Sequence, residues 1–481
     1  MRISLIQKIM GLFLILYSVT LIPPIYISLL YQDGELVHFL LSIGLTLLAG
    51  MVLWLPVRNF RTNIQNRDGF IIVAMFWVVL GLLSALPFLF GTHLSITDAF
   101  FESVSAFTTT GATIFTGLDT LPQSILFYRQ QLQWFGGMGV IVLAIAILPM
   151  LGIGGMQLYR AETPGPFKDE KIAPRITHCA RSFWLIYTVM TLACAAAYWL
   201  AGMSLFDALA HSLSTISTGG FSTHDASLAY FNSPAIELIA VVFMILGGTN
   251  FGIHYYVLLR GRPLMYWRDI EVRIYLILIG LFSLLVAAEL FRTHYHNDFI
   301  SALRFSLFQT VSVITTTGYV TEDFSSWPDF TPSLLFLVSF IGGCAGSTAG
   351  GIKVIRFIIM FKQSGRDLTE LVHPAMEKPI KIAGRVLPER IIDAVWGYFS
   401  LYVASFAAIM LLLMADGMDQ VTAFSSVATS INNFGPGLGE VTANFKSITT
   451  ESKWVLAFAM LLGRLEIFTL LVIFTPSFWR K

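Results

Sequence analysis

Four short segments that combine threonine, serine or asparagine with glycine recur along the chain. When their glycines are aligned, the segments lie 108, 99 and 117 residues apart. Each follows a moderately apolar stretch that is too short to cross a bilayer, which takes about 20 residues. The stretches and segments are 97–108 with Thr-Thr-Thr-Gly at 108–111, 206–216 with Ile-Ser-Thr-Gly at 216–219, 300–314 with Thr-Thr-Thr-Gly at 315–318, and 420–431 with Asn-Asn-Phe-Gly at 432–435. This recurrence predicts four copies of one structural unit.

The residue types of these segments suit the binding of a dehydrated cation. Backbone carbonyls, with hydroxyl groups below them, replace the water around an ion without adding a fixed charge. Glycine lets successive carbonyls point the same way because it tolerates positive φ angles. Four such strands around one axis give rings of four oxygens, which is the geometry of a potassium filter. The predicted filter residues are Thr109, Thr110, Gly111, Ile216, Ser217, Thr218, Gly219, Thr316, Thr317, Gly318, Asn433, Phe434 and Gly435.

Composition places these segments in a membrane protein. The chain has 481 residues, of which 56% are hydrophobic and 12% charged, against about 25% charged in a typical soluble domain. These values exclude a soluble enzyme, a nucleic-acid binder and a disordered chain. The net charge of +1 gives no footprint for nucleic acid. The three cysteines, Cys179, Cys194 and Cys344, are too far apart for a metal motif or a disulfide framework.

Ten apolar stretches predict ten transmembrane helices. They are 9–30, 37–56, 69–90, 133–151, 182–201, 235–259, 274–291, 333–361, 392–414 and 454–474. Of the 30 lysines and arginines, 24 fall on the side that holds both chain ends, which the positive-inside rule makes cytoplasmic. The other six are Arg129, Arg292, Arg304, Lys446, Lys453 and Arg464. The first stretch is read as a retained span, since no cleavage site follows it.

The repeats divide the chain into an N-terminal pair of helices and four pore units. Their predicted boundaries are 1–68, 69–160, 161–262, 263–390 and 391–481. Each unit has a second landmark in its next span: Gly136-Gly137, Gly247-Gly248, Gly342-Gly343 and Gly463-Arg464. The predicted fold is an all-α polytopic membrane protein, with ten helices and four re-entrant pore loops in a pseudo-fourfold arrangement. A single Thr-Thr-Gly sequence also serves close helix packing, but four matched copies favour the filter.

Two features predict a gate below the filter. Residues 342–351 contain five glycines within an apolar span, which makes a regular helix costly. They form either a close-packing kink or an unwound loop under the filter. Arg464 stands where the other units have glycine, and it either pairs with a buried acid such as Glu466 or faces the permeation path. The predicted gate residues are Gly343, Gly346, Gly350, Gly351 and Arg464.

On these filter repeats, and over its whole length, the chain resembles the Trk/Ktr superfamily of potassium transporters. The two extra N-terminal spans resemble the bacterial TrkH/TrkG type of membrane subunit. The fourth segment departs most from the family pattern, with Asn433-Phe434 in place of hydroxyl residues. The resemblance implies a broken helix in the third unit and a pore arginine in the fourth. It also implies a homodimer in the bacterial inner membrane and a cytosolic ring of TrkA-type nucleotide-binding subunits.

The expected function is potassium uptake through a channel-like pore, with potassium as substrate and no cofactor in this chain. The alternative is a secondary transporter that couples potassium to sodium or proton movement. A membrane-embedded enzyme is a third class, but Ser347 in Gly-Ser-Thr has no evident histidine partner. Nucleotide control would come from a partner, because the chain carries neither a dinucleotide-binding nor a Walker A motif.

Overall fold

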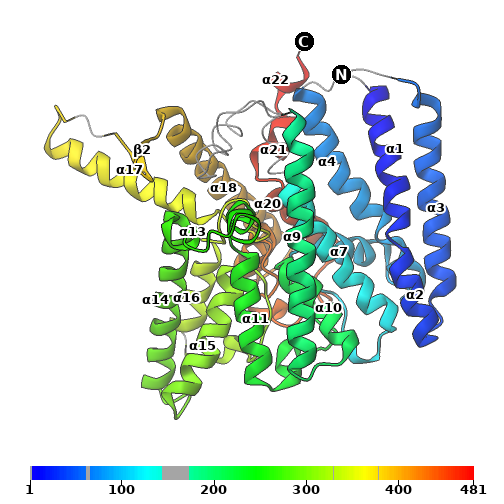
Figure 1. Cartoon of the computed structure of the whole chain (residues 1–481), viewed down its shortest axis with the longest axis horizontal. Helices are drawn as coiled ribbons and strands as arrows, with labels where there is room; N and C mark the ends of the chain where they lie inside the picture. The colour runs from blue at the N-terminus through cyan, green and yellow to red at the C-terminus, as the bar shows by residue number, and fades with distance from the viewer. Residues whose placement is uncertain (1–2, 61–65, 143–172, 329, 377–378, 481) are drawn as a thin grey trace.

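The computed structural model describes residues 3–60, 66–142, 173–328, 330–376 and 379–480. These residues form α-helices and one hairpin of two short strands. Six helices are long and apolar enough to cross a membrane, and eight spans result when two sharply bent helix pairs are counted. The chain thus folds as a helical multi-pass membrane protein. Helix α1 begins and helix α22 ends at the same end of the molecule (Figure 1).

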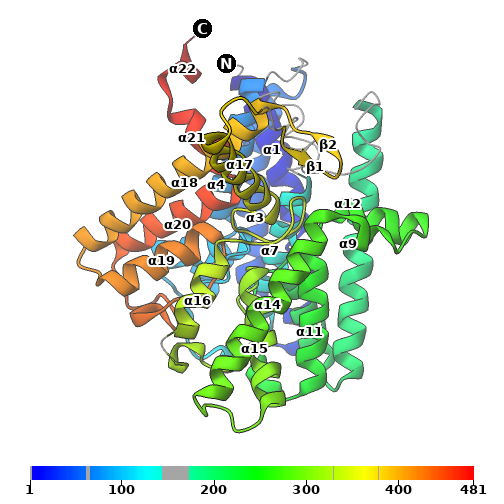
Figure 2. The same ribbon diagram turned by 90° about the vertical axis from the view of Figure 1, so that its left-hand side faces the viewer.

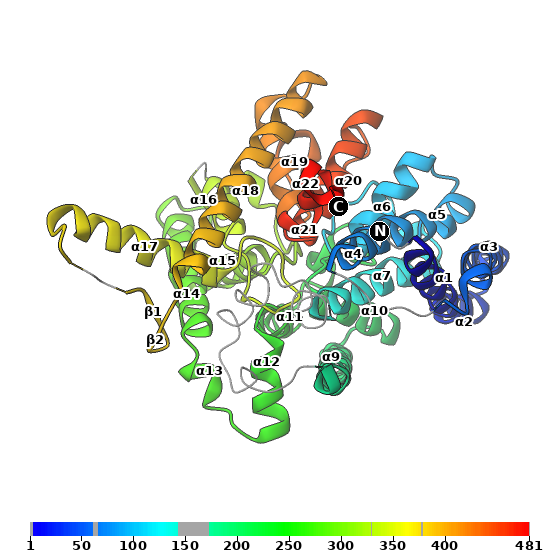
Figure 3. The ribbon, with the colours of Figure 1, turned by 90° about the horizontal axis from the view of Figure 1, so that it is seen from above.

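Three N-terminal helices pack on the outside of the body, beside α4 and α7 (Figure 3). They are α1 (Ile3–Val19), α2 (Ile22–Tyr31) and α3 (Leu36–Trp54), followed by a 3-10 turn at Leu55–Val57. Gly11 and Gly50 let α1 and α3 touch, since a methyl group on Gly11 would lie 2.8 Å from the Gly50 carbonyl oxygen. A hydrogen bond of 2.6 Å between the hydroxyls of Tyr17 and Tyr128 ties this group to α7.

Four units follow, each built as a long helix, a short helix, an extended strand and a second helix. The first unit comprises α4 (Asn66–Leu83), α5 (Leu86–Gly91), α6 (Ile96–Phe107), a 3-10 turn at Leu118–Thr120 and α7 (Gln123–Val142). The second comprises α9 (Ala173–Leu200), α10 (Leu205–Ile216), a 3-10 turn at Ser227–Phe231, α11 (Pro234–Gly247), α12 (Phe251–His254), a π-helical turn at Tyr255–Leu259 and α13 (Met265–Arg268). Seen from above, consecutive units follow one another around the centre (Figure 3).

The last two units complete the circle. The third comprises α14 (Ile270–Arg292), α15 (Phe299–Ile314), a 3-10 turn at Phe324–Ser326, α16 (Phe330–Ser339), α17 (Val354–Val372), β1 (Lys381–Ile382) and β2 (Arg385–Val386). The fourth comprises α18 (Glu389–Ala415), α19 (Gln420–Asn432), a 3-10 turn at Gly439–Val441, α20 (Thr450–Arg464), α21 (Phe468–Leu471), a 3-10 turn at Val472–Phe474 and α22 (Pro476–Trp479). Figure 2 shows α18, α19 and α20 side by side.

The four short helices, α6, α10, α15 and α19, begin in the same way. An N-cap residue, Ser95, Ser204, Asp298 or Asp419, accepts a backbone hydrogen bond from the first turn with its side chain. Such caps satisfy N–H groups that a helix leaves unpaired at its start. The helices therefore have defined starting points although they are only three to four turns long.

Three of the ten predicted spans differ from continuous helices. The spans at 235–259 and 454–474 are bent by 98° and 110°. The second bend lies where Glu466 and Ile467 adopt positive φ angles, which no helix continues through. The predicted span at 333–361 is wrong as a single helix, because α16 ends at Ser339 and α17 begins at Val354.

Glycine explains that last break. Gly342, Gly346 and Gly351 all have positive φ angles between α16 and α17, so the loop form of the glycine-rich segment is confirmed and the helical kink is not. Helix α17 then extends away from the body (Figures 1 and 3). Of the predicted span at 133–151, only residues up to 142 fall within the described part of the chain, where they belong to α7.

Candidate functional site

The four short helices end in one shared backbone turn. The residue after the last helical turn has a left-handed conformation in all four units, with φ angles of 52–54°. These residues are Thr109, Thr218, Thr316 and Asn433. The next residue donates its N–H to the carbonyl five positions back, as from Thr110 to Ser105 at 2.9 Å. Threonine is rare in this conformation, so three such residues at matching positions mark a backbone held in place by its surroundings.

This turn sets which residues are equivalent. Two positions after the left-handed residue comes a glycine with a φ angle of 79–97°, which is Gly111, Gly220, Gly318 or Gly435. The second unit therefore aligns through Gly220, and the alignment through Gly219 in the sequence analysis is wrong by one residue. The cause is the pair Gly219-Gly220, in which composition alone does not identify the glycine that takes the positive φ angle.

The strands close into a ring. A methyl group built on each glycine would collide with the carbonyl oxygen of the neighbouring strand. The distances are 2.3 Å from Gly111 to Gly219 O, 1.9 Å from Gly220 to Thr317 O, 2.2 Å from Gly318 to Phe434 O, and 2.8 Å from Gly435 to Thr110 O. We call the four carbonyls of Thr110, Gly219, Thr317 and Phe434, with the four glycines that follow them, the carbonyl ring. No side chain fits at the glycines because backbone meets backbone there.

The structure brings the predicted filter residues together at these four strands, except that Ile216 is still the last residue of α10. The side chains of the four strands differ. The hydroxyl of Thr110 contacts that of Thr108 at 2.7 Å, and Thr317 contacts Thr315 at the same distance. In the fourth strand, the amide of Asn433 donates to the Thr110 hydroxyl at 2.9 Å. Strands one and four are thus joined by a side chain as well as by their backbones.

A cavity of about 440 Å³ lies at the glycine end of the strands. All four units contribute to its wall, including the ring glycines Gly111, Gly220, Gly318 and Gly435. Three carboxylate residues, Asp225, Glu322 and Asp323, also line it. Carboxylates at a pore entrance raise the local concentration of cations.

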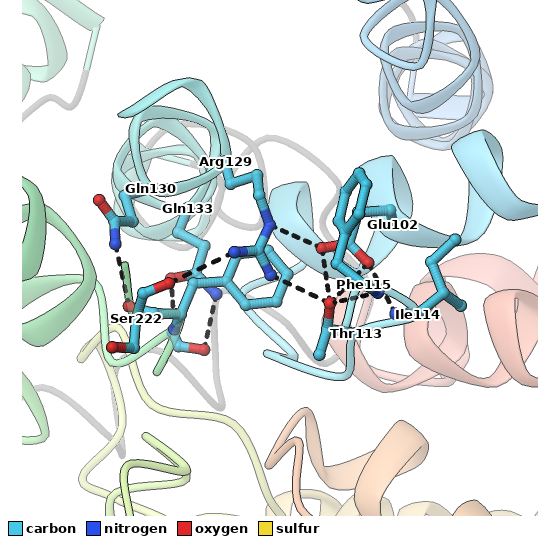
Figure 4. Close-up of polar contacts among 10 residues, drawn as sticks. Glu102, Thr113, Ile114, Phe115, Arg129, Gln130, Gln133 and Ser222 are labelled. Carbon is cyan, nitrogen blue, oxygen red and sulfur yellow. Dashed lines mark hydrogen bonds and ion pairs between the residues drawn. The ribbon is translucent and has the colours of Figure 1, made fainter. Parts of the chain in front are cut away.

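Behind the first two strands lies a buried ion pair that the sequence analysis missed (Figure 4). Nε of Arg129, on α7, donates to Glu102, on α6, at 2.8 Å, and both residues are fully buried. Glu102 accepts from the N–H of Ile114 at 2.9 Å, while Arg129 donates to the Ser222 carbonyl at 3.3 Å. The pair therefore holds one strand on each side.

Arg129 falls outside the predicted span at 133–151, but α7 begins ten residues before that span and includes Arg129. The sequence feature that could have identified Arg129 is its position beside Gln130 and Gln133, close to an apolar span. Polar residues inside membrane helices usually have a specific partner.

On the opposite end of the strands lies the glycine-rich loop, residues 340–353. It contains the predicted gate residues Gly343, Gly346, Gly350 and Gly351. Its hydrogen bonds to the second and fourth units include Cys344 N–H to Gly248 O at 2.8 Å, Thr348 Oγ1–H to Ile216 O at 3.0 Å and Gly351 N–H to Asn432 O at 3.1 Å. Within the third unit, Gly350 N–H donates to Thr316 Oγ1 at 2.6 Å. The loop thus lies directly against the ends of the short helices.

Arg464 reaches the same loop from α20. Its guanidinium donates to the carbonyl of Thr348 at 2.9 Å and to that of Gly136 at 3.3 Å, and the side chain is buried. The pairing of Arg464 with Glu466 is wrong. Glu466 lies at the bend and accepts instead from Arg356 at 2.7 Å. Arg464 thereby brings a positive charge to the loop, with carbonyls as its hydrogen-bond partners in the described residues.

Comparison with known proteins identifies the family. The profile of the TrkH family, described as cation transport protein, matches residues 36–481. The chain belongs to the TrkH family. It is 53% identical to the Trk system potassium uptake protein TrkH of Vibrio parahaemolyticus, and each chain is covered completely. It is 40% identical to the Trk system potassium uptake protein TrkG of Escherichia coli, over 100% of this chain and 99% of TrkG.

A solved structure of the TrkH family confirms the arrangement of the helices. The crystal structure of the potassium transporter TrkH from Vibrio parahaemolyticus superposes on this chain with a TM-score of 0.93. The two chains share 50% sequence identity, and each is covered completely. At this similarity the two proteins have the same fold, so the resemblance to the Trk/Ktr superfamily found in the sequence is confirmed.

Proposed function

We propose that the chain takes up potassium through a single pore per chain, with the carbonyl ring as its selectivity filter. The observation that supports this most strongly is the closure of the ring, since each glycine meets the carbonyl of the next strand. Carbonyl oxygens arranged in a ring can replace the hydration of potassium without adding a fixed charge. The potassium uptake proteins to which this chain is 53% identical support the choice of ion.

The proposed architecture has ten transmembrane helices, with four re-entrant pore loops formed by α6, α10, α15 and α19 and the strands after them. The division into an N-terminal pair, 1–68, and four units remains part of this proposal. Both ends of the chain lie in the cytoplasm, because the lysines and arginines concentrate on that side. The 440 Å³ cavity then faces outward and the glycine-rich loop faces inward.

The glycine-rich loop and Arg464 form the proposed gate. The loop contacts the inner ends of the short helices, and Arg464 adds a positive charge at the same level. Both oppose the passage of a cation, one by occupying space and one by repulsion. We further propose that the protein works as a homodimer in the bacterial inner membrane, regulated by a cytosolic TrkA-type ring that supplies the nucleotide-binding site.

Flux into liposomes that contain only this protein tests the pore. We expect rubidium or potassium to move down its gradient with no sodium or proton gradient imposed. Flux that requires one of those gradients would support the coupled transporter instead. The proposal would be contradicted if folded protein showed no potassium flux without an imposed sodium or proton gradient, with a sodium gradient, and with a proton gradient.

A further inference from the structure

The second strand lacks the side chain that the other three strands carry in the carbonyl ring. Its ring position is Gly219, whereas the other strands have Thr110, Thr317 and Phe434 there. The free space is filled from α7. A methyl group built on Gly219 would lie 2.4 Å from the side-chain Cδ of Gln133. Gln133 therefore occupies the place of the missing side chain.

Both ends of the Gln133 amide are used on the same strand. Nε2 donates to the carbonyl of Gly219 at 2.6 Å, and Oε1 accepts from the N–H of Phe221 at 3.1 Å. These two contacts flank Gly220, the ring glycine with the positive φ angle. The side chain is completely buried, and Figure 4 shows it on the same face of α7 as Arg129. The donor and acceptor fix the orientation of the amide.

Units two and four have no amide side chain at the position equivalent to Gln133. Gly136, Gly247 and Gly463 are equivalent, since a methyl group on each would meet the carbonyl two positions before a left-handed residue, which is that of Phe107, Ile216 or Ile431. Three residues before these glycines stand Gln133, Met244 and Met460. The amide occurs where the neighbouring strand has glycine at its ring position, and methionine occurs in units two and four.

We propose that Gln133 is a specificity-determining residue of the carbonyl ring. The inference rests on the proposed pore function and assigns a role in it to a residue outside the four strands. A carbonyl that accepts a short hydrogen bond is less free to move and is a weaker ligand for a cation. Since the number and field strength of the carbonyls decide between potassium and sodium, the bond to Gly219 keeps the ring from contracting around the smaller ion.

The test replaces Gln133 by methionine, the residue that its equivalents carry. In liposomes, Gln133→Met should raise the permeability of sodium relative to potassium about five- to tenfold, which is the factor that one hydrogen bond typically represents. The matched control is Gln131→Met on the same helix. Gln131 donates to Thr20 O at 2.5 Å, away from the ring, so its loss should leave the permeability ratio unchanged.

A second variant separates the hydrogen bond of Gln133 from the space that its side chain fills beside Gly219. Gln133→Ala combined with Gly219→Thr gives strand two the residue that strands one and three carry but removes the donor to the ring carbonyl, so it should lose potassium selectivity as Gln133→Met does. Unchanged selectivity in assembled Gln133→Met would overturn the inference. If that variant does not assemble, a double variant that keeps full potassium selectivity would overturn it. Wild-type protein without potassium-selective flux would instead contradict the proposed pore, whatever Gln133 does.

Discussion

The carbonyl ring and the glycine-rich loop lie towards opposite ends of the same four strands, and different contacts hold them. Behind the ring, the buried side chains of Glu102, Arg129 and Gln133 anchor the strands from the first unit. The loop is held by backbone groups, such as Cys344 N–H on Gly248 O, and also by buried side chains, since Glu271 accepts from Ala345 N–H at 2.8 Å and Arg464 donates to Thr348 O. Five of the loop residues are glycines, which adopt several backbone conformations at little steric cost. The comparison therefore predicts a fixed ring above a movable loop.

The largest effect is expected from a side chain in the carbonyl ring. Gly318→Ser places Cβ 2.2 Å from the Phe434 carbonyl oxygen at a positive φ angle. Backbone strain of this kind costs about 1–3 kcal/mol, so potassium uptake should fall at least about tenfold. Uptake is measured in cells that lack their own potassium transporters. Gly280→Ser is the control, because a methyl group there meets no atom within 4 Å.

Serine substitutions also test which glycine of the second strand, Gly219 or Gly220, is equivalent to the positive-φ glycines of the other strands. A side chain on Gly220 meets the Thr317 backbone, whereas one on Gly219 meets the flexible end of Gln133. Gly220→Ser should therefore reduce uptake more than Gly219→Ser. The opposite order would restore the alignment through Gly219 and contradict the ring described above.

Removing the charge beside the loop should have the next largest effect. Repulsion between two unit charges 4 Å apart is about 4 kcal/mol at an effective dielectric of 20. We therefore expect Arg464→Met to raise potassium flux about tenfold in liposomes, an estimate that allows for partial screening by water. Thermal stability should change little, since Arg464 donates to carbonyls and leaves no carboxylate unpaired.

Arg356→Met is the matched control for Arg464→Met. It leaves the buried end of Glu466 without its partner, a change that costs about 3–5 kcal/mol when the pair is fully buried. Glu466 is partly exposed, so the loss should be smaller, but stability should fall without a rise in flux. If Arg464→Met lowers stability and leaves flux unchanged, Arg464 is a structural residue and not part of the gate.

A smaller effect is expected from the loop itself. The hydroxyl of Thr348 donates to Ile216 O or Gly247 O, each at 3.0 Å. Thr348→Val keeps the shape and removes this donor, which contributes about 1 kcal/mol. Flux should rise about fivefold while the ratio of potassium to sodium permeability stays constant. A change in that ratio would mean that the loop also shapes the ring, and that the two are not separable.

The sequence predicts the four strands and the glycine-rich loop better than it predicts the side chains that anchor the strands. The four strands and the broken third-unit helix could be predicted, because glycine and threonine recur at matched positions and five glycines do not form a helix. The ring position in the second strand could not, since Gly219-Gly220 offers two glycines and only the fold selects one. The anchors Glu102, Arg129 and Gln133 were missed because their partners lie on other elements. The bends in two spans also depend on tertiary contacts.

The smallest predicted effect concerns the entrance side of the ring, where His224 joins two units. It bonds to Asp119 of the first unit at 2.5 Å and stacks on Tyr230. Burial lowers the pKa of His224, but its pairing with the carboxylates of Asp207 and Asp119 outweighs burial, so the pKa is raised above its usual 6.5. The stabilisation is complete below pH 6.5 and is lost as the pH rises through the raised pKa.

Raising the pH from 6 to 9 should therefore lower the Tm by on the order of 1 °C through this contact. His224→Gln should abolish that part of the pH dependence, because glutamine does not titrate. The contact between His224 and Asp119 lies on the entrance side of the ring, whereas the glycine-rich loop lies at the opposite end of the strands. His224→Gln should therefore leave the increase in flux caused by Arg464→Met intact. An effect of His224→Gln on that increase would show that the entrance and the loop are coupled through the ring, and the fixed ring would have to be abandoned.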